Sequence, residues 1–255
     1  FAQSVVEFVV RYNFDGADID WEYPTGGGEA GNIQRPQDKD NFVLLLGALR
    51  EALDAQGIAD GRRYLLMIAL GAGRSQYQPL DWAQIVPLLD FINVMTYDMA
   101  GPWSSLTDFN APLYASANQP SADTTIRALL ALGIPADKLV MGVPFYGYHW
   151  TNITSANNGL RQPNMPGNGT SLDYGTIAAE YVGQFERFWD DVAQVPWLYD
   201  EASRTMISYD DPESMALKAA YVREQGLGGV MFWEISQDSD DSVLLDAIHA
   251  GLGGG

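Results

Sequence analysis

The chain has 255 residues, a formal net charge of −19 and no cysteine. Hydrophobic residues make up 47% of it, which is ample for a packed core and argues against intrinsic disorder. The negative charge disfavours nucleic acid and anionic membrane surfaces, because both are polyanions that would repel this chain. Without cysteine, disulfide scaffolds and thiol catalysis are excluded, and with only two histidines a multi-histidine metal site is disfavoured. No apolar run reaches the ~18 residues of a membrane span.

The hydrophobic pattern alternates between helix-like segments and short, continuously apolar runs. It predicts helices over residues 1–12, 38–57, 81–89, 121–132, 211–225 and 239–250. It predicts strands over residues 15–23, 64–70, 91–96, 139–143 and 228–233. This alternation indicates an α/β protein with a parallel sheet, either open and doubly wound or closed as a (β/α) barrel. No glycine fingerprint of a dinucleotide-binding fold lies between a strand and a helix, so the barrel is favoured.

One stretch, from Gly147 to about Ser208, breaks this alternation. It is rich in Asn, Gly and Pro, and then carries a helix near residues 177–184 and several short aromatic runs. We predict that it forms a small α+β insertion between the last two strands. The expected parts are therefore a partial barrel over 1–146, the insertion over 147–208, and the last strand with its closing helix over 209–255.

Three acidic residues alternate along the first predicted strand. Because side chains alternate across a strand, Asp18, Asp20 and Glu22 would share one face, about 6.5 Å apart, with Ile19 and Trp21 on the other. Stacked inside a barrel, the three acids cannot all ionise, so at least one pKa is expected to be raised. Carboxylates held close together with one proton retained are what glycoside hydrolysis requires. The alternatives are a solvated acidic edge strand and a site for a hard cation.

Residues 15–24, D-G-A-D-I-D-W-E-Y-P, resemble the catalytic strand of family-18 chitinases. Four later segments resemble further parts of that family in the same order, namely residues 93–103, 142–147, 208–212 and 228–234. One difference stands out. After Tyr146 and Gly147 the family usually carries arginine, and here Tyr148 occupies that position.

The resemblance implies a secreted, extracellular chitinase that hydrolyses chitin or chitooligosaccharides with retention of configuration and needs no cofactor or metal. Its route is substrate-assisted: the acetamido oxygen of the sugar attacks and an oxazolinium ion forms. Glu22 would protonate the leaving oxygen at the end of the strand, where barrel active sites are built. Asp20 would hydrogen-bond the acetamido N–H, and Asp18 would share a proton with it. Tyr97 would hold the acetamido oxygen, unless it is a buried core tyrosine.

Five further residues are candidates for substrate binding. Asp98 would contact the sugar, although a turn cap is the alternative. Met95 lies on the same strand face as Tyr97. Trp233 would form the floor under a sugar ring, unless it is a core tryptophan, and Trp103 and Tyr146 would form the walls of flanking subsites.

Two other functions share these features. A chitinase-like lectin binds sugar without cutting it, but such proteins typically lose the acid that corresponds to Glu22, which is present here. An endo-β-N-acetylglucosaminidase that acts on glycoproteins would use the same acids. The predicted insertion deepens the cleft and favours a linear polymer as substrate.

The five predicted strands correspond, by resemblance, to strands 4–8 of a (β/α)8 TIM barrel. We therefore expect an incomplete barrel with two open sheet edges. Such a chain should self-associate through those edges or be weakly stable alone, with reduced activity.

Overall fold

The computed structural model describes residues 1–115 and 119–254. The chain divides into two compact units, one formed by Phe1–Met95 with Arg127–Val140 and the other by Thr96–Ile126 with Met141–Gly255.

The five predicted strands are all present. They form a parallel sheet in the order β1-β2-β3-β4-β10. Their bounds are β1 (Gly16–Ile19), β2 (Leu65–Gly71), β3 (Phe91–Met95), β4 (Leu139–Pro144) and β10 (Gly229–Trp233). In the register of β1 against β2, Asp18 lies opposite Met67, and β2 in turn pairs in parallel with β3. The parallel α/β architecture expected from the hydrophobic pattern is therefore confirmed.

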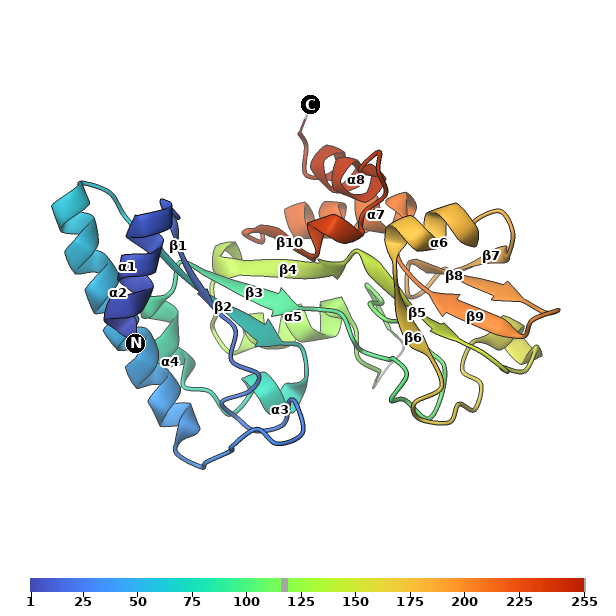
Figure 1. The fold of residues 1–255 in the computed structure, drawn as a ribbon, viewed down its shortest axis with the longest axis horizontal. Coiled ribbons are helices and arrows are strands. Elements are labelled where there is room, and N and C mark those ends of the chain that lie inside the picture. The colour runs from blue at the N-terminus through green and yellow to red at the C-terminus, as the bar shows by residue number, and fades with distance from the viewer. Residues whose placement is uncertain (116–118, 255) are drawn as a thin grey trace. The chain divides into compact units, whose positions relative to one another are not determined.

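Two long helices cover the first unit. Helix α1 (Ala2–Tyr12) packs against α2 (Asp38–Asp60), as Figure 1 shows, and Val6 and Val9 of α1 are buried. The shorter helices are α3 (Arg74–Tyr77), α4 (Trp82–Ile85), the 3-10 turns η1 (Val86–Leu88) and η2 (Ala136–Lys138), and α5 (Ala122–Ala131). The predicted end of α2 at Gly57 is wrong. A Cβ at Gly57 would lie 2.4 Å from the carbonyl oxygen of Arg62, so this glycine permits a close chain approach, and α2 ends at Gly61 with φ 67°.

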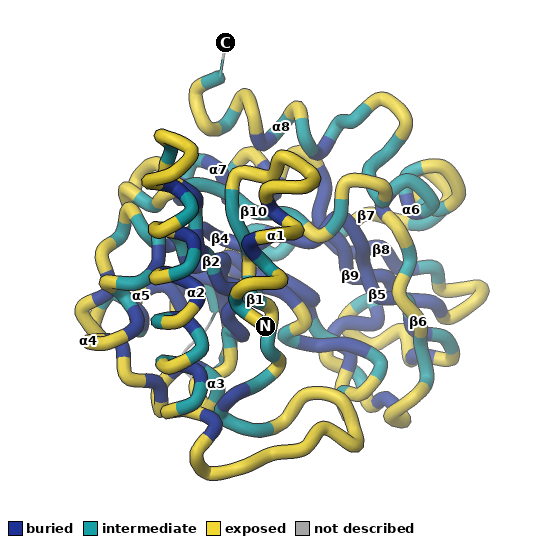
Figure 2. The backbone as a smooth tube through the Cα atoms, turned by 60° about the vertical axis from the view of Figure 1, so that its left-hand side comes forward, coloured by how far each residue is buried: buried dark blue, intermediate teal, exposed yellow. Residues whose placement is uncertain are grey.

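An antiparallel sheet occupies much of the second unit, in the order β6-β5-β9-β8-β7. Its strands are β5 (Tyr146–Trp150), β6 (Thr170–Asp173), β7 (Glu186–Asp190), β8 (Val195–Asp200) and β9 (Thr205–Ser208). It falls in the stretch where an α+β insertion was predicted, and Figure 2 shows β5, β8 and β9 as largely buried. The helix expected near 177–184 is α6 (Tyr174–Glu180), and η3 (Ala156–Gly159) lies in the loop before β6. The boundaries of the three predicted parts stay a prediction.

The last two helices pack against each other, and their starts are set by aspartate caps. Helix α7 (Pro212–Glu224) begins after Asp211, whose carboxylate accepts a hydrogen bond from the Ser214 N–H. Helix α8 (Val243–Gly251) begins four residues later than predicted. The reason is that Asp238 folds back and accepts hydrogen bonds from the N–H groups of Leu244 and Leu245, after the 3-10 turn η4 (Ile235–Gln237).

Strands β1 and β10 end the order of the parallel sheet and are only partly buried. These are the edges at which self-association was expected, and self-association stays a prediction. Within the described ranges, no helix combines the length and the apolar character that crossing a membrane would require.

Asp90, just before β3, joins several parts of the first unit. Its carboxylate accepts hydrogen bonds from Arg50 of α2 (3.1 Å), from Arg63 (2.7 Å) and from the N–H of Leu66 in β2 (2.9 Å). Desolvation disfavours the charged carboxylate, but the hydrogen bonds from Leu66 and Arg63 outweigh it, so the pKa of Asp90 is lowered. The charged form of Asp90 therefore stabilises the folded state.

We expect Asp90→Asn to lower the free energy of unfolding by about 1–3 kcal/mol at pH 7, because it removes charge-assisted hydrogen bonds from a partly buried site. A folded-state pKa below the unfolded value means that this stabilisation is complete above about pH 4 and is lost as the pH falls through the folded pKa. Urea unfolding of both proteins at pH 7 and at pH 3 measures the difference. An equal gap at the two pH values would contradict the linkage.

Candidate active site

The three predicted acids lie at and beyond the end of β1. Only Asp18 belongs to the strand, because the ladder with β2 ends at the pair Ile19–Ile68, so the expectation of one strand over residues 15–23 is wrong. Beyond Ile19 the chain turns as Trp21 packs edge-on against Phe42 of α2, with ring centroids 5.9 Å apart at 84°. Asp20 and Glu22 therefore project from a connecting segment, and both are exposed.

The pKa values of the two inner acids are raised. Desolvation is the largest cause for Asp20, followed by the charges of Glu22 and Asp18. The pKa of Asp18 is raised by desolvation, and a hydrogen bond from Asn93 offsets part of that increase. Asp18 is itself exposed, so the protein around its carboxyl removes only part of its hydration. The electrostatic coupling predicted from the spacing of the acids is therefore present for this pair.

Asn93 is a residue that the sequence analysis did not assign to the site. Its Nδ2 donates to Oδ2 of Asp18 at 2.8 Å, and the side chain is buried on β3. The sequence could have indicated this role, because Asn93 is the single polar residue of the apolar strand Phe91–Met95. A buried polar side chain needs a partner, and Asp18 is that partner.

A hollow of about 260 Å³ borders the outer two acids. It is lined by Asp20, Trp21, Glu22, Tyr23, Asn32, Ile33 and Gln34. The loop after residue 24 is held back toward the acids, because Asn32 Nδ2 donates to the carbonyl of Glu22 at 3.1 Å. Gly28, with φ 78°, makes that approach possible, since a Cβ there would lie 2.1 Å from the same carbonyl oxygen.

Asp98 is the centre of the hydrogen-bond network in the second unit. Its Oδ1 accepts from the hydroxyls of Tyr146 (2.6 Å) and Tyr148 (2.7 Å), and its N–H donates to Oδ1 of Asn110 at 2.8 Å. Asp98 has φ 59°, and this contact with Asn110 holds the unusual backbone in place. Desolvation and the Asp98 charge raise the pKa of both tyrosines, so both keep their protons and act as donors.

Tyr97 and two tryptophans complete the predicted residues of this unit. The Tyr97 hydroxyl lies 3.9 Å from the sulfur of Met231, and its ring lies edge-on to Tyr146 at 6.1 Å. Trp103 is 54% exposed and Trp233 is 53% exposed, so neither indole belongs to the buried core. Met95, which ends β3 in the first unit, is partly buried.

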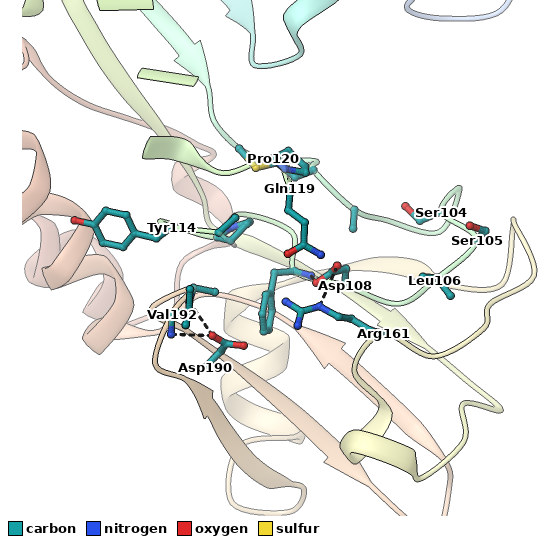
Figure 3. A pocket seen from close by; sticks show the side chains of 16 residues that line it. Ser104, Ser105, Leu106, Asp108, Tyr114, Gln119, Pro120, Arg161, Asp190 and Val192 are labelled. Carbon is teal, nitrogen blue, oxygen red and sulfur yellow. Dashed lines mark hydrogen bonds and ion pairs between the residues drawn. The ribbon is translucent and has the colours of Figure 1, made fainter. Parts of the chain in front are cut away.

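A second hollow, of about 320 Å³, lies within the second unit and is shown in Figure 3. Arg161 faces Asp108 across it at 3.5 Å, and Asp190 accepts hydrogen bonds from the N–H groups of Val192 and Ala193. None of the predicted site residues lines it. In the part of the chain that the structure describes, no group of three or more His, Cys, Asp or Glu side chains is arranged to hold a metal ion.

Known proteins match this fold and its acidic segment over almost the whole chain. The family model "Glycosyl hydrolases family 18" matches residues 1–238. Chitinase A1 of Niallia circulans is 44% identical over 95% of this chain and 37% of its own length. The structure of chitinase ChiA74 from Bacillus thuringiensis superposes with a TM-score of 0.94 at 41% identity, over 100% of this chain and 46% of that one. A family-18 N-acetylglucosaminidase from Paenibacillus barengoltzii superposes with a TM-score of 0.91 at 42% identity, over 98% of this chain and 74% of that one.

Parallel strands followed by helices are the architecture of the TIM-barrel type, in which active sites lie at the carboxyl ends of the strands. The chain belongs to family 18 of the glycosyl hydrolases. It spans less than two thirds of Chitinase A1 and of the ChiA74 chain.

We expect Asn93→Ala to raise the pKa of the Asp18 carboxyl further, because it removes a hydrogen bond to the charged form. Carboxyl ¹³C NMR titration measures this shift directly. Asn41→Ala is a matched control, since Asn41 donates to Asp38 on α2 in the same way and is not bonded to Asp18. An unchanged Asp18 titration in Asn93→Ala would show that this hydrogen bond does not hold the carboxylate.

Proposed function

We propose that this chain hydrolyses chitin or chitooligosaccharides by a retaining, substrate-assisted mechanism. The observation that carries the proposal is the set of three acids at the end of β1, each of which has different surroundings. Asp18 is hydrogen-bonded to Asn93, the pKa of Asp20 is raised beside two other carboxyls, and Glu22 borders an open hollow. Adjacent carboxyls in different surroundings support acid catalysis by one of them beside another that orients the substrate.

We assign the proton transfer to Glu22, which protonates the glycosidic oxygen as the bond to the anomeric carbon breaks. The acetamido oxygen of the substrate attacks that carbon, so the nucleophile belongs to the sugar and not to the enzyme. Asp20 accepts a hydrogen bond from the acetamido N–H, and this makes the acetamido oxygen more nucleophilic. A raised pKa of Asp20 supports proton sharing with Asp18, so that one negative charge serves the pair.

The residues of the second unit have proposed roles in holding the sugar. Tyr97 directs its hydroxyl to the acetamido oxygen and fixes the attacking group in orientation. Asp98 accepts hydrogen bonds from sugar hydroxyls, and the exposed indoles of Trp103 and Trp233 stack on sugar rings. Their exposure supports this role, because an exposed tryptophan face is free to contact a ligand. Met95 and Tyr146 complete the set as flanking contacts.

The finer features of the fold belong to the same proposal. The five parallel strands correspond to strands 4–8 of the family's barrel, and the antiparallel sheet to its α+β insertion. Secretion to the extracellular space suits a polymer that cannot enter a cell.

A second candidate is hydrolysis of terminal N-acetylglucosamine units. The specific observation in its favour is the match to the Paenibacillus barengoltzii N-acetylglucosaminidase, of which this chain covers 74%. The endo-β-N-acetylglucosaminidase alternative would use the same acids on a glycoprotein. Product analysis on chitohexaose distinguishes a chitinase from an enzyme that removes terminal units. The latter releases monosaccharide units one at a time, whereas a chitinase releases oligosaccharides. A sugar-binding lectin is disfavoured, because Glu22, Asp20 and Tyr97 are all present.

We expect Glu22→Gln to lower kcat by about 10²–10⁴-fold while a chitooligosaccharide still binds, because glutamine keeps the shape of the side chain and cannot donate the proton. Release of reducing sugar from chitotetraose measures kcat, because its sugar leaving group needs the proton, and calorimetry measures binding. Glu29→Gln, in the exposed loop after the site, is the matched control and should be fully active. Near-normal turnover in Glu22→Gln would exclude Glu22 as the acid.

We expect the first product to be the β anomer, because attack by the acetamido oxygen and then by water inverts the anomeric carbon twice. ¹H NMR within minutes of mixing with chitotetraose resolves the two anomers before they equilibrate. An initial excess of the α anomer would contradict the substrate-assisted route.

A further inference from the structure

Tyr148 is part of the hydrogen-bond network around Asp98. The side chain is only 7% exposed. Its hydroxyl donates to Oδ1 of Asp98 at 2.7 Å, the same oxygen that accepts from Tyr146 at 2.6 Å. Among the described residues, Oδ2 of Asp98 accepts no side-chain hydrogen bond, so two donors hold one oxygen and leave the other for a ligand.

The ring of Tyr148 has a second contact, with Trp103. The two ring centroids are 5.2 Å apart with an interplanar angle of 82°, an edge-on arrangement that favours a fixed indole orientation. Gly101 supports the same indole, because a Cβ there would lie 2.4 Å from the Trp103 ring. The indole remains 54% exposed, so its position is held by Tyr148 and Gly101 while much of its surface stays open.

We propose that Tyr148 is a positioning residue that holds both the Asp98 carboxylate and the Trp103 indole in place to receive a sugar of the substrate chain. The inference rests on the proposed function, since it concerns how the same substrate is bound. The Tyr148 hydroxyl is a neutral donor, so it holds Asp98 in place without pairing the carboxylate with a cation. The raised pKa of Tyr148 keeps the hydroxyl protonated and neutral at physiological pH.

Three substitutions at two positions separate the two contacts. Tyr148→Phe removes the hydroxyl and keeps the ring beside Trp103, whereas Tyr148→Leu removes both. Tyr199→Phe is the matched control, because Tyr199 is also buried and its hydroxyl donates to the backbone carbonyl of Ile153 in the same unit. Calorimetric titration with chitotetraose in the Glu22→Gln background gives Kd for each variant of the full 255-residue chain.

We expect Tyr148→Phe to weaken chitotetraose binding about tenfold, which is the size of a lost hydrogen bond to a charged group. Tyr148→Leu should weaken it by up to about tenfold more, because the indole loses its edge-on partner. Tyr199→Phe should leave Kd unchanged. With Glu22 restored, Tyr148→Phe should raise KM and leave kcat within about twofold, whereas a folding defect would reduce the active fraction and lower kcat with KM unchanged.

A double-mutant cycle with Asp98→Asn tests whether Tyr148 acts through Asp98. In the Asp98→Asn background, Tyr148→Phe should have little further effect on Kd. An undiminished effect in that background, or an unchanged Kd in Tyr148→Phe, would overturn the inference while the proposed function stands. If the Glu22→Gln chain bound no chitotetraose and the unmodified chain cleaved none, the proposed function would fail, and this inference with it.

Discussion

The first unit brings three carboxyl groups close together at and just beyond the end of one strand. Charges of the same sign repel, so such a set persists only if protons or hydrogen bonds compensate the repulsion. Here Asn93 donates to Asp18, and desolvation raises the pKa of both Asp18 and Asp20. The short strand β1 supplies the fixed end from which the other two acids extend.

The surroundings of the acids follow from backbone requirements. The chain leaves β1 after Ile19, and packing of Trp21 on Phe42 directs it away from the sheet. Gly28 then lets the next loop return to the carbonyl of Glu22, where Asn32 donates a hydrogen bond. The hollow beside Glu22 is therefore bordered by an aromatic residue of the acidic segment, Trp21, and by a loop that Gly28 and Asn32 hold against that segment.

The second unit uses a different means to hold a carboxylate. Asp98 receives two neutral donors on one oxygen, and its backbone is fixed by Asn110. Both donors are neutral hydroxyls, so these contacts hold the carboxylate without placing a cation beside it.

The sequence by itself determined the elements that depend on local patterns. Apolar runs identified four of the parallel strands, and the alternating segment with Asp18, Asp20 and Glu22 indicated the first. The catalytic roles of these acids stay a prediction. Features set by contacts between distant residues could not be predicted. Helix α2 passes Gly57 because that glycine accommodates Arg62, and α8 starts late because Asp238 caps it. The partners of Asp18 and Asp98, which lie far along the chain or across a sheet, were decided only by the tertiary structure, because no local pattern specifies which buried polar groups will meet.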